Sequence, residues 1–135
     1  MILKALLLAT AIIEIPTGIA LLAVPALFAS TLLGAALDAP AGLAVARVAG
    51  AALIALGVAC WLARNDAQSH AARGVIFAML LYNLGAVALL AHAGLGLGLW
   101  GIGLRPAVLL HAALTAWCLV CLRARRVIDS SALQS

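Results

Sequence analysis

Four long apolar runs make up most of the chain, and short polar or glycine-rich segments separate them. Each run is close to the roughly 20 residues that a helix needs to cross the hydrocarbon core of a bilayer. The pattern predicts spanning helices over residues 2–24, 41–63, 74–93 and 105–122, followed by a polar tail over 123–135. We therefore predict an all-α protein, an integral membrane four-helix bundle that forms a single domain over residues 1–135.

Two of the connecting segments are themselves apolar but are too short to span. Residues 26–40 place apolar side chains at helical spacing, namely Leu27, Phe28, Leu32 and Leu33. This spacing predicts a short helix that lies at the membrane interface between the first two spans and ends at Pro40. Residues 94–103 alternate glycine with apolar residues, which disfavours a helix. We expect a loop at the interface there, with Trp100 as an anchor at the level of the lipid headgroups.

The composition excludes several classes of protein. Hydrophobic residues make up 67% of the chain and charged residues 9%, whereas soluble domains have roughly 45–50% and about 25%. A soluble enzyme, a disordered tail and a disulfide scaffold are therefore excluded. The three cysteines, Cys60, Cys118 and Cys121, lie in apolar runs, and we interpret them as small apolar packing residues rather than as a redox or metal site.

The placement of the cations predicts the orientation in the membrane. One side of the predicted bundle carries Lys4, Arg64, Arg73, Arg123, Arg125 and Arg126, and the other side carries Arg105. Because cytoplasmic loops are enriched in lysine and arginine, both termini should face the cytoplasm of a bacterial inner membrane in this multi-pass protein. The cations do not gather on one exposed face, so we expect the bilayer, and no nucleic acid, as a partner.

Each predicted span contributes a polar side chain at a similar depth in its outer half. These residues are Glu14, Arg47, Asn83, which follows Tyr82, and His111. A charge inside the membrane normally has a partner or a water-filled cavity. We expect Arg47 to pair with Glu14, and Asn83 and His111 to complete the hydrogen bonding. This polar centre is either a structural lock or a pocket that binds a small amphipathic molecule or a proton. No catalytic set and no metal-ligand spacing is visible.

Four short motifs carry a resemblance to small bacterial membrane proteins. They are Glu14-Ile-Pro-Thr-Gly18, Ala46-Arg47-Val-Ala-Gly50, Tyr82-Asn83 and Arg105-Pro106-Ala-Val-Leu-Leu-His111. With the four spans, they make the chain similar to DoxX-like four-helix proteins. The resemblance implies an accessory or small-ligand-binding subunit rather than an enzyme, with homo-oligomers or a larger membrane complex as partners. It also implies an alternative, a membrane subunit of a quinone-linked redox complex with Tyr82 and His111 near the quinone.

A second resemblance rests on the acidic residue of the first span. Glu14 is in the position of the glutamate of small multidrug resistance transporters, which also have four spans. This likeness implies a proton-coupled exporter that uses Glu14. The departures from that family are the strong charge bias between the two sides and Arg47, which would compete for the carboxylate. The third span also has only Gly85 near its middle where those transporters have a glycine pair.

Overall fold

The computed structural model describes residues 2–67 and 69–132, and every regular element among them is a helix. The helices are α1 (Ile2–Ala23), α2 (Pro25–Leu33), α3 (Pro40–Ala63), α4 (His70–Leu95) and α5 (Leu104–Ala132). Four of them, all but α2, are long and apolar enough to cross a membrane. The four predicted spans and the short helix after the first are therefore confirmed as helices.

Several helix boundaries differ from the prediction. The short helix ends at Gly34, which has a left-handed φ of 71°, rather than at Pro40, because glycine adopts this C-cap conformation without strain. Helix α4 begins at His70 because the Ser69 side chain caps it, accepting a hydrogen bond from the Ala72 N–H at 3.0 Å. Helix α5 continues past the predicted end of its span to Ala132.

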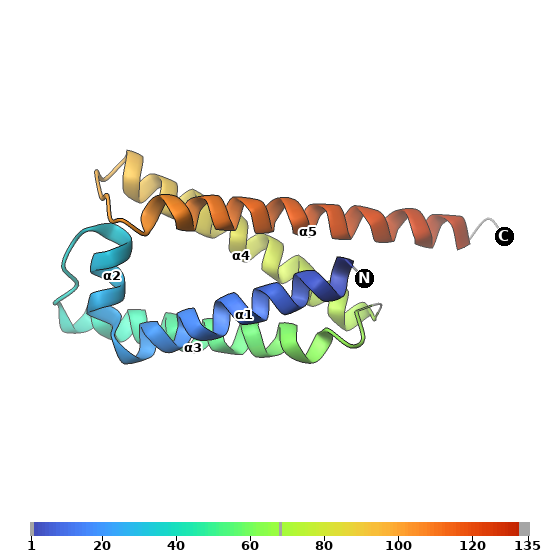
Figure 1. The fold of residues 1–135 in the computed structure, drawn as a ribbon, viewed down its shortest axis with the longest axis horizontal. Coiled ribbons are helices and arrows are strands. Elements are labelled where there is room, and N and C mark those ends of the chain that lie inside the picture. Colours follow the sequence, from blue (N-terminus) through green and yellow to red (C-terminus); the bar gives the residue numbers. More distant parts are fainter. Residues whose placement is uncertain (1, 68, 133–135) are drawn as a thin grey trace.

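The long helices form two packed pairs. Helix α1 packs mainly on α3, and α4 mainly on α5. The N-terminus, the α3–α4 connection and the C-terminal end of α5 lie at one end of the molecule, and α2 and the α4–α5 loop lie at the other (Figure 1). We call these the terminal end and the loop end. This arrangement leaves the two pairs in contact along part of their length, with α2 between them at the loop end.

The core between the pairs lies toward the terminal end. Leu6, Leu7, Ile76 and Met79 are among its fully buried side chains. The three cysteines are free, and each is fully buried. All three pack in the same cluster as these apolar side chains. Their interpretation as small apolar packing residues is therefore confirmed.

Glycines bring α1 and α3 into backbone contact. A Cβ atom on Gly18 would lie 2.5 Å from the Gly50 carbonyl oxygen, and one on Gly57 would lie 2.6 Å from Ile15 Cγ1. Only glycine allows so close an approach, as in other small-residue helix interfaces in membranes. The contacts fix the antiparallel register of the pair, with Gly50 opposite Gly18 and Gly57 opposite Ile15 and Glu14.

Candidate functional site

A cavity of about 550 Å³ lies between the two helix pairs, and all five helices contribute to its wall. Most of the wall is apolar, and Phe28 and Leu32 of α2 form part of it. Four polar side chains also line it: Glu14, Thr17, Tyr82 and His111. Three of the predicted site residues, Glu14, Tyr82 and His111, therefore share one cavity, together with a polar residue from the next turn of α1.

Glu14 is the most unusual of these residues. Its side chain is 1% exposed, and Oε1 has no hydrogen-bond partner among residues 2–67 and 69–132. The Glu14 carboxyl interacts with the side-chain hydroxyl of Tyr82. A buried polar atom that lacks a partner is costly, by about 1–3 kcal/mol, so native proteins rarely keep one without a reason. The carboxyl therefore has unused capacity to accept a hydrogen bond at the wall of the cavity.

The helix around Glu14 carries a local irregularity. Pro16 lies inside α1, where it has no N–H to donate to the carbonyl one turn earlier. The next residue, Thr17, donates its hydroxyl to the Ile13 carbonyl at 2.7 Å. This is the bond that a threonine hydroxyl makes to the carbonyl four residues earlier in a helix, and it lies one residue beyond the Ile12 carbonyl that Pro16 leaves without its usual donor. The donor of Thr17 is thereby occupied, and its oxygen can accept a bond from the cavity.

Asn83 lies behind the cavity and orients His111. The Asn83 side-chain Nδ2 donates to the Met79 carbonyl at 2.7 Å, which turns Oδ1 toward His111 Nδ1, also at 2.7 Å. Because Oδ1 can only accept, the hydrogen-bond network assigns the proton to Nδ1. In the neutral ring Nε2 then carries the free lone pair. The arrangement gives the imidazole one orientation and leaves a single acceptor nitrogen unused.

Tyr82 fixes the same imidazole from a second direction. The Tyr82 and His111 rings meet edge to face, with their centroids 5.6 Å apart and their planes at 83°. This is the geometry that aromatic pairs prefer over a face-to-face stack. Tyr82 thus contacts the imidazole with its ring and Glu14 with its hydroxyl. Four of the predicted residues, Glu14, Tyr82, Asn83 and His111, form one connected group.

Arg47 is not part of this group, so the expected pairing with Glu14 is wrong. The Arg47 side chain is exposed, and its Nε donates to the Leu22 carbonyl over 3.4 Å. The register of α1 and α3 is the physical reason. Leu22 lies eight residues beyond Glu14 on α1, about 12 Å along the helix axis. Arg47 therefore lies nearer the loop end, where a long side chain can extend its charge toward the headgroups.

Sequence reasoning missed the part of α2 that faces inward. Phe28 and Leu32 are half-buried and line the cavity, although their spacing was interpreted only as the apolar face of a surface helix. Helical spacing shows that these apolar side chains share one face of the helix. It does not show whether that face meets lipid or the inside of the protein. The part of the chain that the structure describes holds no group of three or more His, Cys, Asp and Glu residues able to bind a metal ion.

Comparisons of the chain with models of protein families, with curated proteins and with solved structures find no match. The geometry of the cavity therefore carries the functional interpretation.

Proposed function

We propose that this protein is a small ligand-binding or accessory subunit of a bacterial inner membrane, and that the cavity between its helix pairs binds a small amphipathic molecule. The observation that carries the proposal is the carboxyl of Glu14, buried at the cavity wall with Oε1 unpartnered. A ligand that donates a hydrogen bond to this atom would remove the cost of its burial. The apolar wall would hold the rest of the ligand.

The free polar groups favour a ligand that brings donors. The Glu14 carboxyl, the oxygen of Thr17 and the free nitrogen of His111 can all accept. Among the side chains that the structure describes, no lysine or arginine lines the cavity. An amine with an apolar tail fits this set better than a fatty acid, whose carboxylate would face Glu14. A quinol hydroxyl would also donate hydrogen bonds to these acceptors. The same cavity could therefore serve the alternative function, a subunit of a quinone-linked redox complex.

The distribution of charge supports the proposed orientation. The terminal end carries Lys4, Arg64, Arg73 and Arg123, as expected for the cytoplasmic side. The cavity reaches α2 at the opposite end, through Phe28 and Leu32. In this orientation the cavity lies in the outer half of the membrane, and α2 lies near the outer interface.

Two glycines of α4 offer a matched test. A Cβ on either Gly85 or Gly74 would meet nothing within 4 Å, but only Gly85 lines the cavity. We expect Gly85→Leu to fill part of the cavity and Gly74→Leu to leave it open. Native mass spectrometry of the purified chain with decylamine and decanoate would measure the binding of each.

The expected result is that the wild type and Gly74→Leu retain decylamine in preference to decanoate, and that Gly85→Leu retains neither. Glu14→Gln should lower the retention of decylamine, because the amide keeps the size of the side chain but removes its charge. Equal retention by the Gly85→Leu and Gly74→Leu variants would contradict binding in this cavity. A preference for decanoate would contradict the acceptor-rich site.

Within the described part of the chain Glu14 has no basic partner, which favours a second candidate function, a proton-coupled exporter. A membrane carboxyl can exchange a proton for a cationic substrate only when no fixed cation neutralises it. Arg47, the residue that would compete, bonds instead to Leu22. Efflux of ethidium from inverted vesicles under an imposed pH gradient would test this function. Export requires transport by the wild type and its loss in Glu14→Gln, whereas a binding subunit shows no transport in either.

A further inference from the structure

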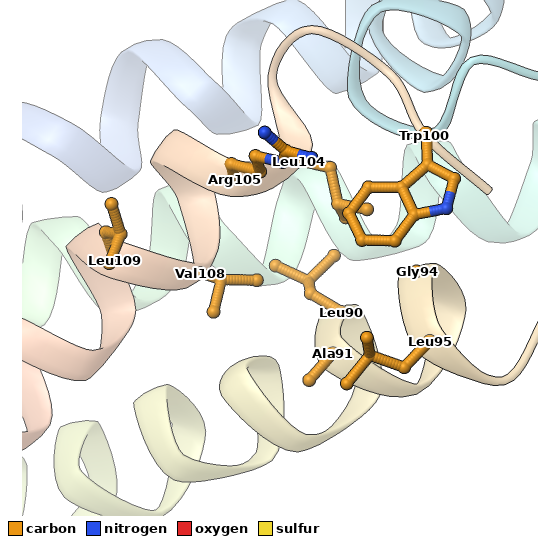
Figure 2. Close-up of a pocket in the computed structure, with 9 residues that line it drawn as sticks. All are labelled: Leu90, Ala91, Gly94, Leu95, Trp100, Leu104, Arg105, Val108 and Leu109. Carbon is orange, nitrogen blue, oxygen red and sulfur yellow. The ribbon is translucent and has the colours of Figure 1, made fainter. Parts of the chain in front are cut away.

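A second cavity lies at the loop end, next to the polar cavity around Glu14, and Leu90 lines both. It has a volume of about 330 Å³, and the last turns of α4 and the first turns of α5 form its walls. Figure 2 shows the Leu90 and Val108 side chains directed toward one another across it, and Trp100 over Gly94. Every lining residue except Arg105 is apolar or glycine: Leu90, Ala91, Gly94, Leu95, Trp100, Leu104, Val108 and Leu109.

A guanidinium and an indole form the rim of this apolar cavity. The Arg105 guanidinium carbon lies 5.3 Å from the centroid of the Trp100 ring, within the range of a cation–π interaction. The same two side chains, with Gly101 and Ile102, line an adjoining hollow of about 480 Å³. Trp100 and Arg105 thus line both the apolar cavity between α4 and α5 and the adjoining hollow at the α4–α5 loop.

The rim is held rigidly by the loop and α2. The Gly103 N–H donates to the Thr31 carbonyl at 3.0 Å, and the Leu104 N–H donates to the Gly101 carbonyl at 3.1 Å. Gly101 lies directly against the α2 backbone, where a Cβ would overlap the carbonyls. Leu104, next to Arg105, is 2% exposed. A site whose parts are already fixed loses less conformational entropy on binding.

The charge at the rim is not neutralised. Within the described parts of the chain, the Arg105 guanidinium contacts the Trp100 ring. No carboxylate in these parts pairs with the guanidinium. Arg105 also lies in the first turn of α5, where the partial positive charge of the helix N-terminus adds to its own. An anion beside Arg105 would therefore meet two sources of positive potential, with apolar walls directly adjacent.

We propose that the cavity and its rim form a binding site for an anionic phospholipid. An acyl chain occupies the apolar cavity between α4 and α5, and the phosphate lies against Arg105 in the adjoining hollow. Trp100 lies between the two, at the boundary where tryptophan is enriched in membrane proteins. Basic pockets between spanning helices bind anionic lipid headgroups on the cytoplasmic side of membranes, and the same attraction between a guanidinium and a phosphate applies to Arg105 at the loop end. Leu90 lines both this cavity and the one around Glu14, but Trp100 and Arg105, which carry the proposal, line only the former.

Competition between two lipids tests the proposal. The full chain, stripped of lipid in detergent, would receive equal amounts of phosphatidylglycerol and phosphatidylcholine with identical acyl chains, and native mass spectrometry would measure the ratio of the two adducts. The wild type should retain more phosphatidylglycerol. Arg105→Gln should lower the ratio about five-fold, which corresponds to about 1 kcal/mol for one cation near a headgroup. Arg105→Lys should keep most of the preference.

Two further variants separate this site from general attraction of anions. Arg73→Gln removes a cation from the terminal end, outside the cavity, and should leave the ratio unchanged. Ala91→Phe should fill the apolar cavity and lower both adducts without changing their ratio, and it keeps the proposal testable should Arg105→Gln fail to fold. An unaltered ratio in Arg105→Gln, or an equal drop in Arg73→Gln, would overturn the proposal. Displacement of phosphatidylglycerol by an equal amount of oleate would identify a free fatty acid as the occupant and would overturn it as well.

Discussion

Replacing Gly18 with alanine should force α1 and α3 apart. The added Cβ would lie 2.5 Å from the Gly50 carbonyl oxygen, 2.7 Å from Ile54 Cγ1 and 3.0 Å from the Ile54 amide nitrogen. The Ile54 side chain can rotate away, but the two backbone atoms cannot. Ordinary contacts begin at 3.4 Å, so the backbones must separate by about 0.9 Å at this point.

Two opposing terms set the size of the effect. Overpacking a close contact costs about 1–3 kcal/mol, and the upper part of this range applies because the atoms that Cβ meets belong to the backbone. Alanine in place of glycine favours the helix by about 1 kcal/mol. The difference predicts that Gly18→Ala lowers the free energy of unfolding by about 1–2 kcal/mol. The apparent melting temperature should fall by several degrees.

The buried cysteines supply the assay. Cys60, Cys118 and Cys121 are each 0% exposed, so a thiol-reactive fluorogenic dye reaches them only as the bundle opens. A thermal ramp with this dye in detergent gives a melting temperature for each variant. Gly74→Ala is the matched control, because its Cβ meets nothing within 4 Å. It should melt at the wild-type temperature or above it.

A Gly18→Ala variant that melts no lower than Gly74→Ala would refute the reasoning. That outcome would mean that α1 and α3 do not touch at Gly18 and Gly50. The register derived from this contact would then be wrong, and with it the separation of Arg47 from Glu14.

The remaining predictions concern the polar residues and the loop. The effects of Arg47→Ala and Glu14→Gln on stability should add within about 0.5 kcal/mol in a double-mutant cycle, because the two side chains share no contact; a larger coupling would restore their pairing. Asn83→Ala should lower stability by about 1–3 kcal/mol in the same melt, because it leaves His111 Nδ1 without its acceptor; an unchanged melt would contradict that bond. Gly101→Ala should cost about 1–3 kcal/mol by pushing the loop off α2, and equal stability to the wild type would disprove their close packing.

The helices follow from the sequence because one physical requirement dominates it. Backbone groups in hydrocarbon must bond within their own segment, so a long apolar run becomes a helix. The deviations occur at the ends, where water and capping compete. Ser69 extends α4 toward its N-terminus by capping it, and Gly34 ends α2 early with a positive φ. Both are local effects that hydropathy alone does not measure.

Most of the polar group was also predictable, because polar side chains are costly in a membrane and therefore gather away from lipid. Glu14 and Asn83 are buried, and Asn83 bonds to His111. The orientation of the imidazole was not predictable. It depends on the Met79 carbonyl, which selects the direction of the Asn83 amide. A backbone group one turn away has no signature in the residue types.

The error over Arg47 shows what hydropathy cannot measure. Equal depth below the ends of two spans brings their side chains together only where those ends lie in one plane. The actual register depends on where the α1 and α3 backbones can touch, which is where both helices lack a Cβ. Gly18 faces Gly50, and Gly57 faces Glu14 and Ile15. Glu14 therefore lies opposite a glycine, which has no side chain to pair with it, and its carboxyl interacts instead with Tyr82 of α4.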